Sequence, residues 1–115
     1  MSRQIVIAHD DAGFLDQASL ALREAGYDDI SVFSDANAAL FAMAGGVELL
    51  ITRVAFPTGT QGIALALMAR RSTPGIKIVF AARPEFREGA RGLGEFLAMP
   101  VNIADLVATV KGLIG

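Results

Sequence analysis

The chain has 115 residues, of which 53% are hydrophobic and 19% charged, and its net charge at pH 7 is −2. This length predicts one domain, 1–115, with enough apolar material for a core, while the slightly acidic charge gives no basic face for nucleic acid. Cysteine is absent, which excludes disulfides and zinc–thiolate sites, and no apolar run approaches the roughly 18 residues of a membrane span, so we expect a cytoplasmic domain.

The first half of the chain alternates strand-like and helical patterns. The run 4–8 is rich in β-branched residues, which is typical of a strand buried on both faces. A helical stripe over 11–25 follows and stops at Gly26. After a second short strand at 29–33, either Ser34 or Asp35 can cap the next helix.

The second half repeats this alternation. Glycines 45 and 46 end the second helix, and a third strand is expected at 47–52. A loop at 57–62 leads into a helix that runs to about Arg71, and a fourth strand follows at 76–81. Pro84 suits the first turn of a weak, glycine-interrupted helix that extends to about Arg91. A fifth strand is expected at 95–98, and Asn102 caps a last helix.

Five strand-then-helix units in this order favour an α/β fold with a parallel sheet between two layers of helices. We predict a flavodoxin-like (βα)5 sandwich with strand order 2-1-3-4-5. In such sheets the functional site lies at the carboxyl ends of the strands, beside the switch point between strands one and three. The residues expected at this edge are His9, Asp10, Asp11, Arg53, Ala81, Ala82, Met99 and Pro100.

This pattern resembles the receiver domain of response regulators (CheY-like), the phosphoacceptor module of two-component signalling. The resemblance covers essentially the whole chain and is carried by the segments 5–11, 49–62, 76–82 and 96–106. It implies a pocket of five positions: two adjacent acids that hold Mg²⁺, a phosphoacceptor Asp, a Thr or Ser, and a Lys. It also implies a cis peptide bond before Pro100.

The sequence departs from the family pattern at four of those five positions. The two acids correspond to His9 and Asp10, with Asp11 as an additional acid, and the phosphoacceptor corresponds to Arg53. The hydroxyl residue corresponds to Ala81 and the lysine to Met99. The scaffold positions Pro57, Gly62 and Pro100 are kept.

These departures remove the family's chemistry. Arg53 has no nucleophilic carboxylate and places a positive charge where Mg²⁺ would bind. Ala81 has no hydroxyl group, and Met99 cannot neutralise a phosphoryl group. No Asp or Glu occurs between Glu48 and Glu85, so a shifted alignment restores no acceptor. We interpret the chain as a pseudo-receiver that needs no cofactor or metal and is not an enzyme.

Two expectations concern the altered pocket. Arg53 can take the place of the metal and pair with Asp10, and also with Asp11, because a guanidinium group suits carboxylates; the alternative is that Arg53 points into solvent. His9 is either a pH-sensitive group or metal ligand, or simply a polar residue at the mouth of the pocket.

The resemblance also indicates a docking surface made by the fourth helix, the fifth strand and the fifth helix. Its candidate residues are Arg87, Arg91, Phe96, Asp105 and Lys111. Such a face would bind a signalling protein (a histidine kinase, a regulator or an output domain) or form a homodimer. The alternative is that Phe96 merely packs and the charges are solvated.

An arginine group suggests a second class of function. Arg side chains bind phosphates through two parallel hydrogen bonds and stack on bases, so a cyclic dinucleotide or another small ligand could be sensed on the same fold. No glycine-rich phosphate loop accompanies the group. Its members are Arg70, Arg71, Arg83, Arg87 and Arg91.

Overall fold

The computed structural model describes residues 4–57 and 59–115, which form a five-stranded parallel sheet with the order β2-β1-β3-β4-β5. The predicted sheet and its order are therefore confirmed. The strands are β1 (Ile5–Ala8), β2 (Ile30–Phe33), β3 (Leu49–Thr52), β4 (Lys77–Ala82) and β5 (Glu95–Ala98). The helices are α1 (Ala12–Glu24), α2 (Ala36–Ala42), α3 (Gly62–Ser72) and α4 (Ile103–Ile114), with 3-10 turns η1 (Met43–Gly45) and η2 (Pro84–Phe86).

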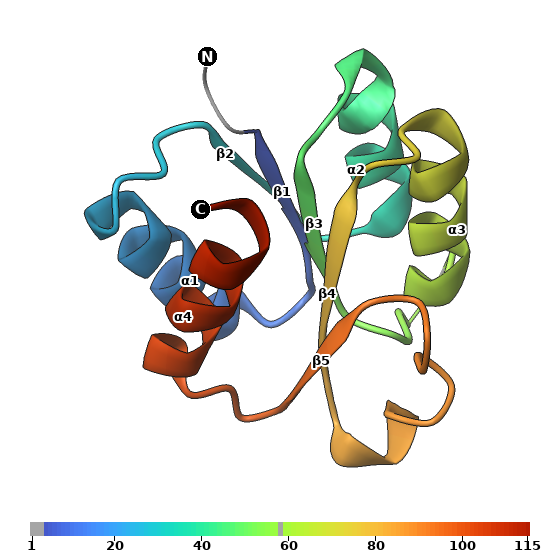
Figure 1. The fold of residues 1–115 in the computed structure, drawn as a ribbon. Helices are drawn as coiled ribbons and strands as arrows, with labels where there is room; N and C mark the ends of the chain where they lie inside the picture. Colours follow the sequence, from blue (N-terminus) through green and yellow to red (C-terminus); the bar gives the residue numbers. More distant parts are fainter. Residues whose placement is uncertain (1–3, 58) are drawn as a thin grey trace.

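Helices cover both faces of the sheet (Figure 1). α1 and α4 pack together on one face, and α2 and α3 pack together on the other. Successive side chains of a strand point to opposite faces, so a strand covered on both sides must be apolar throughout. All four residues of each central strand, β1 and β3, are buried, and all are apolar except Thr52, whose hydroxyl group donates to the carbonyl oxygen of Arg53. The sheet thus separates two apolar clusters.

The parallel register brings the carboxyl ends of the strands to one edge. Ala8 lies opposite Phe33 on one side and Thr52 on the other, and Thr52 lies opposite Phe80. The chain leaves β1 toward α1 and leaves β3 toward α3, which are on opposite faces of the sheet. A ligand-binding crevice is expected where the chain leaves two neighbouring strands toward opposite faces of the sheet.

Side-chain caps fix the starts of three helices. The Asp11 carboxylate accepts a hydrogen bond from the backbone N–H of Phe14 at 3.0 Å, at the start of α1. Asp35, rather than Ser34, caps α2, and Asn102 caps α4 as predicted. Each cap satisfies a backbone N–H that the first turn of a helix leaves unpaired.

The predicted fourth helix is wrong. All residues between β4 and β5 are described, and they form the short turn η2 followed by irregular turns, not an α-helix. The backbone N–H groups of Arg87, Arg91 and Leu93 each donate to the carbonyl oxygen three residues earlier, which is the bonding of tight turns. A Cβ atom at position 94 would lie 2.4 Å from the carbonyl oxygen of Ile78, so Gly94 allows this turn to press against β4.

Candidate functional site

The site lies at the carboxyl edge of the central strands. Arg53 directly follows β3, and its backbone N–H donates to the carbonyl oxygen of Ala8 at 3.2 Å. The side chain of Arg53 donates from Nη1 to Oδ1 of Asp10, the second residue after β1. The predicted ion pair is therefore confirmed. Both side chains are about three-quarters buried, with 24% and 27% of their surface exposed.

The pair is asymmetric. Arg53 engages Asp10 through a terminal nitrogen, while its Nε is buried and has no hydrogen-bond partner among residues 4–57 and 59–115. Asp11 is not turned to this pair, because its carboxylate caps α1. The guanidinium group thus pairs with one of the two acids that the sequence placed near it. Desolvation offsets much of the Coulomb energy of such a pair, so its main effect is on charge and geometry.

The loop after β3 holds Arg53 in place. The backbone N–H of Gly62 donates to the carbonyl oxygen of Val54 at 2.9 Å. The side-chain amide of Gln61 accepts from the backbone N–H of Phe56 at 2.7 Å and donates to its carbonyl oxygen at 3.1 Å. Gln61 was missed in the sequence because a glutamine in a loop carries no signal of its own. It closes the loop as a backbone strand would.

His9 is buried, with 3% of its surface exposed, so the expectation of a polar residue at the mouth of the pocket is wrong. Its Nε2 lies 3.0 Å from the carbonyl oxygen of Ala81, and its Nδ1 accepts from the backbone N–H of Asp11 at 3.1 Å. The ring also packs on Phe14 with centroids 4.7 Å apart. A carbonyl oxygen can only accept, so the neutral tautomer with hydrogen on Nε2 fits both contacts.

Burial lowers the pKa of His9 below 6.5 because the imidazolium form would be desolvated. The hydrogen bond to Ala81 raises the pKa and the positive charge of Arg53 lowers it, while Asp10 and Asp11 raise it by smaller amounts. Both ring nitrogens already have partners. His9 is therefore a structural bridge in this pocket and offers no nitrogen to a ligand.

The remaining pocket positions are apolar. Ala81 is fully buried within the cluster beneath α1 and α4. The backbone N–H of Met99 donates to the carbonyl oxygen of Ala82 at 2.8 Å, and the peptide bond from Met99 to Pro100 is cis, as the resemblance implied. A cavity of about 220 Å³ lies beside them, lined by Asp11, Gly13, Phe14, Gln17, Met99, Pro100 and Val101.

Known proteins share this architecture. No known protein-family model matches the sequence, and no curated protein sequence does. Solved structures do match. The chain is similar to the chemotaxis protein CheY4 of Vibrio cholerae, with 19% identity over 99% of this chain and 100% of that one and a TM-score of 0.83. It is also similar to the receiver domain of the hybrid histidine kinase CckA, with 27% identity over 97% and 99% of the two chains and a TM-score of 0.80.

A third similar structure is that of a two component transcriptional regulator AraC from Clostridium phytofermentans. The identity is 20%, over 98% of this chain and 92% of that one, and the TM-score is 0.87. The chain has the receiver fold. In this receiver fold, the position that follows the third strand is occupied by Arg53.

The docking face was predicted from the fourth helix, the fifth strand and the fifth helix. The fourth of the predicted helices is not formed, so this part of the prediction is wrong. Arg87 lies just after η2, with its guanidinium carbon 4.7 Å from the ring centroid of Phe96. Phe96 is half-buried and packs against one apolar cluster. Asp105 and Lys111 are exposed on α4, the last helix. The face is therefore built from turns, β5 and α4.

Three members of the arginine group have separate local partners. Arg70 on α3 donates to the carbonyl oxygen of Leu93. Arg83 pairs with Glu85 at 3.3 Å, and Arg91 pairs with Glu88 at 2.9 Å. These contacts use the charges individually, so the structure adds no support for a shared phosphate site.

Within residues 4–57 and 59–115, no group of three or more His, Cys, Asp or Glu side chains has the arrangement of a metal site. Within the same residues, no helix has the length and hydropathy that crossing a membrane requires.

Proposed function

We propose that this chain is a pseudo-receiver, a protein–protein interaction module that works in two-component-type signal transduction without being phosphorylated and without catalysing a reaction. The ion pair between Arg53 and Asp10 carries this proposal. It occupies the strand end where the acceptor carboxylate of a phosphorylated receiver would stand. A guanidinium group is cationic at every physiological pH and cannot attack phosphorus.

The chemistry of the surrounding residues supports the proposal. Mg²⁺ requires several oxygen ligands in a near-octahedral array, and the one acid at this strand end that matches the family pattern, Asp10, is paired with Arg53. Ala81 offers a methyl group where a hydroxyl would bind the phosphoryl oxygen. Met99 offers a thioether where an ammonium would neutralise it. Each substitution acts against phosphorylation separately.

The similar structures suggest the class of partner. They include a chemotaxis protein, a transcriptional regulator and a domain of a hybrid histidine kinase. A histidine kinase, a regulator or an output domain in the cytoplasm is accordingly the proposed partner, and a homodimer through β5 and α4 is the other form of the same interaction. The exposed candidate contact residues are Arg87, Arg91, Asp105 and Lys111, and Arg87 lies over the ring of the half-buried Phe96.

Backbone amide NMR tests the lost chemistry. Beryllofluoride, a phosphoryl mimic, is titrated with Mg²⁺ into the protein, and sodium fluoride with Mg²⁺ serves as the blank. We expect no saturable shifts at Asp10, Arg53 or Ala81, because the cation site is filled and no carboxylate is available to bind beryllium. Saturable shifts at those residues would show that the pocket still binds a phosphoryl group and would refute the proposal.

A further inference from the structure

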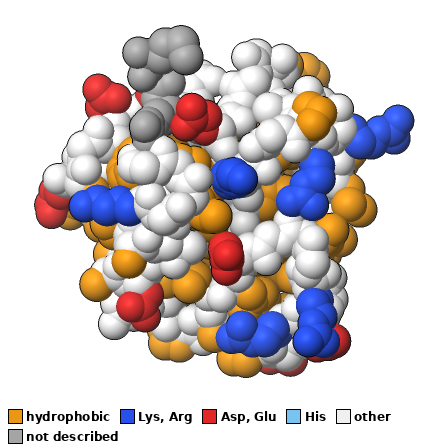
Figure 2. Space-filling view, in the orientation of Figure 1, with side chains coloured by type: hydrophobic (Ala, Val, Ile, Leu, Met, Phe, Trp, Pro, Cys, Tyr) orange, Lys and Arg blue, Asp and Glu red, His pale blue; other side chains and the backbone are white. Residues whose placement is uncertain are grey.

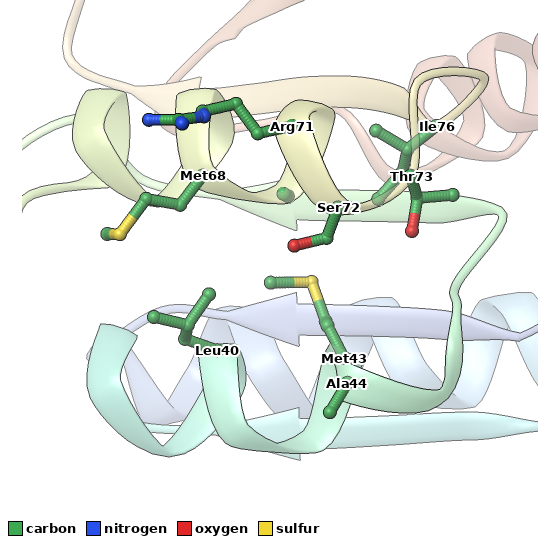
Figure 3. A pocket seen from close by; sticks show the side chains of 9 residues that line it. Leu40, Met43, Ala44, Met68, Arg71, Ser72, Thr73 and Ile76 are labelled. Atoms are coloured by element: carbon green, nitrogen blue, oxygen red, sulfur yellow. The ribbon is translucent and has the colours of Figure 1, made fainter.

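A groove lies between α2–η1 and α3, at the opposite end of the sheet from Arg53 (Figure 3). Its volume is about 410 Å³. Two sets of side chains at i, i+3 and i+4 spacing, which lie on one side of a helix, line it; Met68 and Ser72 point toward the other helix, while the side chain of Arg71 runs along α3 (Figure 3). The two sets are Leu40, Met43 and Ala44 on one wall, and Met68, Arg71 and Ser72 on the other, with Ala69, Thr73 and Ile76 completing the lining.

The groove is apolar and adaptable. Met68 is partly exposed and offers a flexible, polarizable thioether to another protein, whereas Met43 on the facing side is 4% exposed and packs in the core cluster. Phe41 and Leu67, each next to a lining residue in sequence, are 87% and 47% exposed. They are two of four large apolar side chains that are exposed in the described chain.

The charge of this surface has one sign. α2, η1 and α3 carry two charged side chains, Arg70 and Arg71. Arg70 reaches the carbonyl oxygen of Leu93, whereas Arg71 lines the groove and has no ion-pair partner among residues 4–57 and 59–115. In Figure 2, hydrophobic and cationic side chains share the right-hand side of the molecule, where α3 lies in Figure 1.

We propose that this groove binds an amphipathic helix of a partner protein, with apolar side chains at i, i+3 or i+4 spacing seated between the partly exposed Leu40 and Met68 and a carboxylate near Arg71. Helices bind apolar grooves in this manner, and the carboxylate supplies the charge that the groove lacks. A second copy of the chain is a less suitable partner. In a twofold contact, α2 and α3 of one copy would meet α2 and α3 of the other, and these helices carry no acidic side chain that could pair with Arg71. The inference uses no residue of the degenerate pocket.

A peptide library tests the proposal. Randomised helices displayed on a stable helical scaffold are selected against the full chain. We expect the enriched sequences to combine an apolar stripe with Asp or Glu. The Arg71→Glu variant should bind these helices at least tenfold more weakly, and selection against it should enrich Lys or Arg instead. The control variant Arg83→Glu, at the far end of β4, should change neither the affinity nor the enriched residues. No enrichment, or enrichment that ignores the charge at position 71, would overturn the inference.

Methionine methyl NMR locates the binding. The chain has four methionines, and two of them line the groove. On addition of a selected helix, we expect the ¹³C-methyl signals of Met43 and Met68 to shift and that of Met99, at the opposite end of the sheet, to stay. Shifts confined to Met99 would contradict the proposal. A dimer in light scattering that Phe41→Glu converts to monomer would assign the groove to a second copy and would equally contradict it.

Discussion

The imidazole of His9 is bonded to the carbonyl oxygen of Ala81 at 3.0 Å, across the intervening strand β3. His9 follows β1 and Ala81 lies in β4, so this contact ties together two strands that are not neighbours. The other ring nitrogen receives the backbone N–H of Asp11 at the start of α1. One neutral side chain therefore joins a helix and two strands at the functional edge.

The first prediction is a loss of stability in mild acid. The pKa of His9 is below 6.5 in the folded protein, so the unfolded chain binds the proton more tightly. The protonation of His9 therefore does not affect the free energy of unfolding above about pH 6.5. As the pH drops from there toward the lowered pKa, the free energy of unfolding falls by at most about 1.4 kcal/mol per pH unit. Urea unfolding between pH 5 and 8 measures this slope. His9→Gln should abolish it, and an unchanged slope in that variant would contradict the assignment.

The second prediction concerns the coupling between Arg53 and Asp10. A double-mutant cycle with Arg53→Ala and Asp10→Asn should give a coupling free energy of about 0.5 to 1 kcal/mol. This value is typical of an ion pair that keeps some contact with water. The more exposed pair of Arg83 and Glu85, with side chains 63% and 62% exposed, should give less in the matched cycle. Thermal or urea unfolding of the variants supplies the energies. Equal coupling in the two pairs would mean that the pocket adds nothing to this contact.

The third prediction is that Gly62→Ala disrupts the site. A Cβ atom at position 62 would lie 1.7 Å from the carbonyl oxygen of Arg53, and backbone cannot move aside as a side chain can. We expect a loss of about 3 kcal/mol or more, seen as a lower denaturation midpoint. Gly75→Ala is the matched control, because nothing lies within 4 Å of its Cβ position. Similar losses in both variants would rule out the steric cause.

The fourth prediction separates two phenylalanines. Phe41 is 87% exposed, so Phe41→Ser should change the free energy of unfolding by less than about 0.5 kcal/mol. Phe80 is fully buried in the sheet, and Phe80→Ala should cost about 3 to 5 kcal/mol. Urea titration of the two variants measures the difference. A large loss in Phe41→Ser would mean that this ring has a structural role in the monomer.

Much of the fold could be predicted from sequence because strands buried on both faces are apolar throughout. The segment of β1 is of this kind, as is that of β3 up to Thr52, and Asp35 and Asn102 identify helix starts by their hydrogen-bonding chemistry. The segment after β4 could not be predicted correctly. Its proline start suits a helix, but the backbone N–H groups of Arg87 and Arg91 bond three residues back, so the segment forms successive tight turns.

The site was predictable to a lesser degree. Opposite charges at adjacent strand ends predict the pair of Arg53 and Asp10, since the parallel register brings them together. The burial of His9 depends on packing against Phe14 and on the direction of the Ala81 carbonyl, which no local pattern encodes. The groove by Met68 was missed for a related reason, because an apolar stripe on a helix reads as core whether or not a neighbour covers it.

The cation beside Asp10 belongs to the polypeptide itself. A metal ion leaves its site when it is diluted or chelated, but the guanidinium group of Arg53 remains attached to β3 at a fixed effective concentration. EDTA, dialysis and changes in cellular Mg²⁺ therefore have no means of emptying this position. Under the proposed function, the amount of protein present, rather than the occupancy of its pocket, is the quantity through which the domain carries information.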